Sequence, residues 1–95
     1  MRIDFNVAGV TFEGRQGLLQ SKYHKHIVAS LRPEPENPHD SNAIAVYADD
    51  LKVGYVPKGM NEEVKRNLDK TQLVEMNVGY SYDIGKYFAN VSVYC

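Results

Sequence analysis

Apolar and polar residues alternate along several short stretches of this chain, and this pattern restricts the possible folds more than any other feature. Successive side chains of a β-strand point to opposite faces, so alternation predicts a strand with one buried face. In residues 73–82, for example, Val74, Met76 and Val78 are separated by polar residues. The same reasoning predicts six strands, at residues 2–8, 23–32, 44–46, 51–57, 73–82 and 89–94.

Turn and helix signals lie between these stretches. The adjacent Asp49 and Asp50 predict a tight hairpin turn, because Asp tolerates the dihedral angles that such turns require and bonds its own backbone. A helical turn is expected at residues 16–20. Asn61 is expected to cap a short helix before the fifth strand. The buried face of that helix is predicted to consist of Met60, Val64 and Leu68.

The order of these elements predicts an all-β fold with one short helix. Strands that follow one another through short turns favour an antiparallel sheet, and 95 residues are the length of a single domain, 1–95. Six strands close most economically into a small antiparallel barrel, which removes exposed sheet edges. An open α+β sheet is the alternative.

Charge and residue types restrict the function. The net charge of −1 argues against a protein that holds nucleic acid by bulk electrostatics alone. Four basic residues and no acid lie in 14–32, whereas five acids and no Lys or Arg lie in 33–51. This asymmetry indicates either a small basic patch on a nearly neutral body or two ordinary solvated faces.

Signals for catalysis, cofactors or membranes are weak. His24 and His26 would share one face of a strand, but zinc requires further ligands that nothing in the sequence brings near. There is no phosphate-binding glycine loop or nucleophile motif, and the lone Cys95 cannot form an internal disulfide. We therefore expect no enzyme activity, metal or cofactor. Because no signal peptide or membrane-length apolar run is visible, we expect a cytoplasmic location and no membrane contact.

Aromatic residues and one polar corner point instead to binding. Seven tyrosines and three phenylalanines are present, and aromatic rings stack on bases while Arg or Lys holds phosphates. The corner "PEPENPHDSN" precedes the third strand and carries His39 and Asp40 at its apex. A purely structural role is the alternative, in which Asn37 and Asp40 bond the backbone of a wide turn and Asn42 closes it.

The segment "RPEPENPHDSNAIAVYADDLKVGYVPK", residues 32–58, resembles the HIRAN domain family, and "VAGVTFEGRQ" is similar to that family's first strand and its following glycine. The resemblance covers nearly the whole chain. It implies a modified OB-like barrel that binds DNA and is often attached to SNF2-type helicases and nucleases. In the best understood case, such a domain captures the 3′ end of single-stranded DNA.

The resemblance also implies roles for individual residues. Asp40 would accept a hydrogen bond from the terminal 3′-hydroxyl, and His39 would stack on a terminal base. Asn37 would hold the corner or bond a base edge. Lys58 matches a phosphate-binding position after the "VGY" element, which contains Tyr55.

Three further residues complete the expected binding face, namely Arg15, Arg32 and Tyr87. Val10 and Thr11 replace an Arg–Tyr pair of the end-binding member, and Arg15 would substitute for the lost phosphate contact. The sequence thus predicts a standalone, non-catalytic module for single-stranded DNA or DNA ends in DNA repair or processing, with a helicase or nuclease as its partner. The alternative is a protein-interaction module without DNA contact, and the choice between DNA and RNA stays open.

Overall fold

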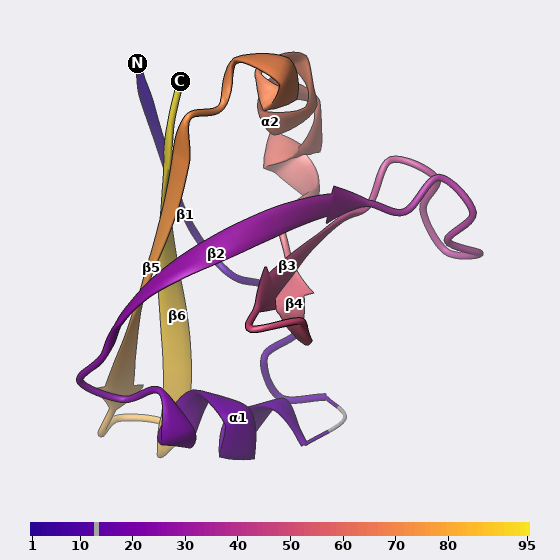
Figure 1. Ribbon diagram of the computed structural model, residues 1–95. Helices are drawn as coiled ribbons and strands as arrows, with labels where there is room; N and C mark the ends of the chain where they lie inside the picture. The colour runs from indigo at the N-terminus through magenta and orange to yellow at the C-terminus, as the bar shows by residue number, and fades with distance from the viewer. Residues whose placement is uncertain (13) are drawn as a thin grey trace.

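Six strands form one antiparallel sheet in the computed structural model, which describes residues 1–12 and 14–95 (Figure 1). The strands are β1 (Arg2–Asn6), β2 (His26–Pro33), β3 (Ile44–Ala48), β4 (Leu51–Tyr55), β5 (Leu73–Ser81) and β6 (Lys86–Tyr94). They lie in the order β1-β6-β5-β2-β3-β4. The helices are α1 (Arg15–Ser21) and α2 (Asn61–Arg66), and short 3₁₀ turns lie at Lys58–Met60 and Leu68–Lys70.

Strand β2 is the reason why the sheet curls. Its first residues, 26–28, pair with β5, and its later residues, 29–33, pair with β3. One strand therefore joins the β1-β6-β5 layer to the β3–β4 hairpin, and Figure 1 shows it crossing between the two. The result is a half-barrel of the OB-like kind, which confirms the expected fold class.

The two outer edges of the sheet meet just after β1. Ala8 donates a backbone hydrogen bond to Tyr55 (2.7 Å) and accepts one from it (2.9 Å). Gly54 makes this approach possible, because a Cβ at that position would lie only 2.3 Å from the carbonyl oxygen of Ala8. The curled sheet is thus joined across its open side by an isolated bridge rather than by full strand pairing.

The alternating apolar residues meet in the interior, as the sequence predicts. The inward positions of the strands are buried, including Ile3, Phe5, Ile27 and Met76. Both helices contribute to the same apolar cluster, α1 through Leu19 and α2 through Val64. The hairpin turn is also as predicted, since Asp49 and Asp50 both have positive φ angles (51° and 65°).

Two local predictions are wrong. Asn61 does not cap α2 but is its first residue, and Met60 at the N-cap makes no side-chain capping bond. His24 does not belong to β2 but to the preceding turn, with φ of 66°, where its ring stacks on Tyr23. The two histidines therefore do not share a strand face, and His26 pairs with Glu75 instead.

Neither a metal cluster nor a membrane helix is found where the structure describes the chain. No three His, Cys, Asp or Glu residues among 1–12 and 14–95 are grouped so as to hold a metal ion. Over the same residues, every helix is too short or too polar to span a bilayer.

Candidate functional site

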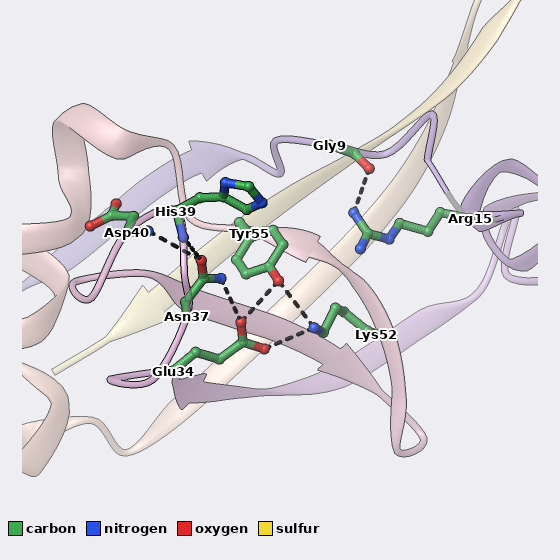
Figure 2. A network of polar contacts seen from close by, with 8 residues as sticks. All are labelled: Gly9, Arg15, Glu34, Asn37, His39, Asp40, Lys52 and Tyr55. Atoms are coloured by element: carbon green, nitrogen blue, oxygen red, sulfur yellow. Dashed lines mark hydrogen bonds and ion pairs between the residues drawn. The ribbon is translucent and has the colours of Figure 1, made fainter.

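The corner between β2 and β3 is built by its own polar side chains. The amide oxygen of Asn37 accepts hydrogen bonds from the backbone N–H groups of His39 (2.9 Å) and Asp40 (3.1 Å) (Figure 2). At the base of the corner, the N–H of Glu34 donates to the carbonyl of Ala43 (2.9 Å). The structural role that the sequence suggested for Asn37 is therefore present, and it fixes the direction of the corner.

A second network ties this corner to the β3–β4 hairpin. The carboxylate of Glu34 accepts hydrogen bonds from Asn37 (3.0 Å) and the Tyr55 hydroxyl (2.9 Å) and forms an ion pair with Lys52 (2.8 Å). Lys52 also donates to the Tyr55 hydroxyl (3.0 Å). Figure 2 shows all four side chains converging under the corner. The Tyr55 hydroxyl thereby donates one hydrogen bond, to Glu34, and accepts another, from Lys52.

Protonation at this network follows from the same contacts. Burial raises the pKa of Glu34, but the hydrogen bonds from Lys52, Asn37 and Tyr55 outweigh burial, so its net pKa lies below the ordinary value. The hydrogen bond to Glu34, followed by that to Tyr55, raises the pKa of Lys52. Both groups are therefore charged at neutral pH.

A bulge in β4 explains why Lys52 and Tyr55 meet. Tyr47 pairs with Lys52, but the next residue back, Val46, pairs with Gly54, so β4 contains one extra residue. An extra residue reverses the alternation of faces beyond it. Lys52 and Tyr55 can therefore reach one another on one side of the hairpin, although strict alternation would place residues three apart on opposite faces.

A cavity of about 540 Å³ lies beside the corner. Six of the eight residues predicted for the binding face line it, which are Arg15, Asn37, His39, Asp40, Tyr55 and Lys58. They come from α1, the corner, β4 and the 3₁₀ turn after it. Segments that are distant in the sequence are thus brought to one concave site, to which these six residues contribute two cations, one carboxylate and two aromatic rings.

Asp40 is half-buried at the edge of this cavity. One carboxylate oxygen, Oδ1, accepts the N–H of Asn42 (2.9 Å), and the other, Oδ2, accepts the side-chain amide of Asn61 (3.1 Å). A carboxylate offers about four acceptor positions, so each oxygen retains capacity for a further donor. Asp40 can therefore form the Asx-type turn and still accept a hydrogen bond from a ligand.

Arg15 brings a buried cation to the opposite wall. Its side chain is only 6% exposed, and one guanidinium N–H donates to the carbonyl of Gly9 (2.7 Å). The guanidinium carbon lies 5.6 Å from the ring centre of Tyr55, within range of a cation–π contact. In Figure 2, Tyr55 lies between the corner and Arg15.

Arg32 and Tyr87 lie outside the cavity. Arg32 forms an ion pair with Asp50 (2.5 Å) and packs over the ring of Tyr47, at 4.0 Å. Tyr87 packs edge-on against Tyr80 (4.8 Å) and Tyr23 (5.5 Å). The structure therefore gives both residues local packing partners and does not bring them to the other six.

Sequence reasoning missed six residues of the cavity wall, of which Phe12 and Asn61 bring an aromatic ring and a side-chain amide. Phe12 is 64% exposed and lines the cavity, and the sequence analysis did not assign it to the binding face. Asn61 also lines it, and the capping signal concealed this role. An apolar ring in a glycine-flanked loop, outside any alternating stretch, was the available clue to Phe12.

Known proteins resemble this chain in both sequence and fold. The family model for the HIRAN domain matches residues 1–90. The chain belongs to the HIRAN domain family. A crystal structure of the HIRAN domain of human HLTF superposes with a TM-score of 0.61 and 19% sequence identity, covering 97% of this chain and 74% of that one. No match was found among curated proteins. HIRAN domains are known generally as DNA-binding modules, and the structural likeness extends over nearly all of this HIRAN chain.

Proposed function

We propose that residues 1–95 form one HIRAN domain that binds the 3′ end of single-stranded DNA without catalysing a reaction. The observation that carries this proposal is the cavity of about 540 Å³, where Asp40, His39, Lys58 and Arg15 meet in a chain of the HIRAN family. These residues supply an acceptor, a ring and two cations at one concave place.

Asp40 gives the site its preference for an end. A carboxylate accepts a hydrogen bond from a free hydroxyl, whereas it repels a phosphate. Every internal nucleotide of a strand carries a phosphodiester at its 3′ position, and only the last one carries a free 3′-hydroxyl. A half-buried carboxylate therefore distinguishes a strand terminus from a continuous strand.

The aromatic and cationic groups hold the rest of the terminal nucleotides. The exposed His39 and Phe12 offer rings on which bases stack, a contact that tolerates any sequence. Lys58 and Arg15 offer positive charge to the phosphates. Arg15 takes the place of the phosphate contact that is lost where Val10 and Thr11 replace an Arg–Tyr pair, and it does so from α1 rather than from the strand.

The biological setting follows from this chemistry. A module that recognises a 3′ end and carries out no reaction serves to place a partner at that end. We propose a role in DNA repair or processing in the cytoplasm, with a helicase or nuclease as the partner.

A protein-interaction module is the second candidate. Exposed apolar side chains gather at the β5–β6 hairpin, where Tyr82, Ile84 and Phe88 are 86%, 69% and 41% exposed. The net charge of −1 also suits a protein partner better than a polyanion. This surface lies apart from the cavity residues.

Salt dependence separates the two candidates. The affinity of the purified chain for a labelled single-stranded oligonucleotide should fall as salt rises, with a log–log slope of about −0.7 for each phosphate neutralised. Duplex DNA with blunt, blocked ends should bind more weakly at each salt concentration. If no oligonucleotide binds even at low salt, the DNA-binding proposal fails and the protein-interaction candidate stands.

A further inference from the structure

Asn61 is the buried polar side chain that the proposed function leaves unexplained. It is 6% exposed and opens α2, and its Nδ2 donates to Oδ2 of Asp40 (3.1 Å). Its own oxygen, Oδ1, is buried without a hydrogen-bond partner, and it is the one such side-chain atom found in residues 1–12 and 14–95. Asn61 lines the cavity beside the corner and also an adjoining hollow of about 550 Å³.

Asp40 fixes the orientation of this amide. If the amide turned over, Oδ1 would face the carboxylate oxygen and two acceptors would oppose one another. The NH₂ group of the amide must therefore point at Asp40, and the amide oxygen is left as the unsatisfied atom. Buried polar atoms are nearly always paired, so an acceptor without a partner beside a ligand cavity indicates a donor that arrives with the ligand.

The two side chains together indicate what that donor is. Asp40 and Asn61 are hydrogen-bonded neighbours, and each has an acceptor oxygen with capacity for a further donor. The sugar at the end of a DNA strand brings one free hydroxyl, whereas a ribonucleotide brings two hydroxyls on adjacent carbons. The 2′-hydroxyl is also the group by which proteins tell ribonucleotides from deoxyribonucleotides.

We propose that Asp40 and Asn61 form a paired acceptor for the two hydroxyls of a 3′-terminal ribonucleotide. Asp40 takes the 3′-hydroxyl, and Oδ1 of Asn61 takes the 2′-hydroxyl. The inference rests on the proposed binding of strand ends and adds a preference for the sugar of the last nucleotide. No covalent step is involved.

The direct test measures how tightly the chain of residues 1–95 binds three single strands of one sequence. They end in a deoxyribonucleotide, a ribonucleotide or a 2′-O-methyl ribonucleotide, all with a free 3′-hydroxyl, and fluorescence anisotropy gives each Kd. The ribonucleotide end should bind about threefold or more tightly than the deoxy end, as one added hydrogen bond predicts. The 2′-O-methyl end should lose this gain, because methylation removes the donor.

A matched pair of variants assigns the effect to Asn61. Asn61→Leu should remove the preference for the ribonucleotide end, whereas Asn67→Leu, at the other end of α2, should retain it. Asn67 donates to the carbonyl of Glu63 and does not line either hollow. Circular dichroism and thermal unfolding verify that each variant folds. If Asn61→Leu does not fold, the comparison of the three strand ends on the unaltered chain decides whether the paired acceptor exists.

Each outcome has a distinct meaning. Equal affinity of the unaltered chain for the ribonucleotide and deoxy ends overturns the paired acceptor but leaves end binding intact. Equal preference in Asn61→Leu and the unaltered chain also overturns it. Failure to bind any of the three strands overturns the proposed function itself.

Discussion

At the scale of single residues, the corner shows how one side chain can be both structural and available. Oδ1 of Asp40 closes a turn with Asn42 and Oδ2 is held by Asn61, so its carboxylate points in a fixed direction. Such positioning lowers the entropic cost of binding, because the acceptor needs no ordering when the ligand arrives. Structural and ligand-binding interpretations of Asp40 are therefore compatible.

Substitution of Asp40 tests its part in recognising the hydroxyl. Asp40→Ala should weaken binding to a strand with a free 3′-hydroxyl about tenfold, since a hydrogen bond to a charged group is lost. Binding to a 3′-phosphorylated strand should change little or improve, because a repulsive charge is removed. Asp83→Ala, on the exposed turn between β5 and β6, serves as the control, and equal losses on both strands would defeat the assignment.

Glu34 gives a prediction about stability and pH. Glu34→Gln should cost about 1–2 kcal/mol at pH 7, because charge-assisted hydrogen bonds to Lys52 and Tyr55 are weakened. The pKa of Glu34 is lowered on folding, so its stabilising effect is present above its ordinary value of 4.5 and is lost as pH falls through the lower folded value.

Urea unfolding of both proteins measures this effect. The stability difference between the unaltered chain and Glu34→Gln should be largest at pH 7 and should shrink as the pH falls below about 4.5. Other carboxylates titrate in both proteins and cancel in the difference. A difference that stays constant down to pH 2 would show that the ion pair does not stabilise the fold.

At the scale of elements, the alternation of apolar and polar residues predicts the strands but not the irregular contacts between them. Each strand has one buried face, so residues such as Ile27 and Met76 reveal it locally. The bulge in β4 and the bridge from Ala8 to Tyr55 depend on partners far away in the sequence. Neither Gly54 nor its neighbours carry a local signal for such contacts.

The bridge itself depends on a missing side chain. In Gly54→Ala, the added Cβ would lie 2.3 Å from the carbonyl oxygen of Ala8 and 2.6 Å from a methyl group of Val7, so backbone must move. We expect a loss of about 1–3 kcal/mol in the free energy of unfolding. Gly59→Ala is the control, because nothing lies within 4 Å of its added Cβ.

Thermal and urea unfolding of these two glycine variants give the comparison. Gly54→Ala should also weaken oligonucleotide binding, since Tyr55 forms the bridge, Gly9 follows its other residue, and both line the cavity. Similar stability in the two variants would mean that the edges of the half-barrel need not meet there.

The candidate site was predicted in part for related reasons. Asn37, His39 and Asp40 are contiguous and stand out in one polar segment, so the sequence places them together. Asn61 joins them only because α2 packs beside the corner, and its capping signal pointed elsewhere. Arg32 and Tyr87 were expected at the site, but no local pattern reveals that β2 and β6 carry them away from it.

At the scale of the whole molecule, charge is arranged locally rather than in bulk. The net charge is −1, yet Arg15 and Lys58 line the cavity together with Asp40, the one acidic residue among its lining residues in the part of the chain that the structure describes. Another hollow, on the far side of the corner, carries Glu34 and Glu36 with Lys52. We therefore expect a polyanion to bind at the first hollow rather than at the second.

Lys58 should accordingly act on all sequences alike. Lys58→Ala should lower the affinity for single strands of any base composition and reduce the log–log salt slope by about 0.7, the contribution of one phosphate. Lys70→Ala, in the 3₁₀ turn after α2, should leave both quantities unchanged. A shift in base preference without a change of slope would rule out the phosphate role.

The most direct measurement of end recognition compares a linear single strand with the circle made by joining its ends. Both have the same sequence and nearly the same charge, and only the linear form has a free 3′-hydroxyl. Titrated at low and moderate salt, the linear strand should bind at least about tenfold more tightly than the circle at both concentrations, because the Asp40 contact is lost with the end. Equal affinity for the two forms would contradict the claim that the cavity receives a strand terminus.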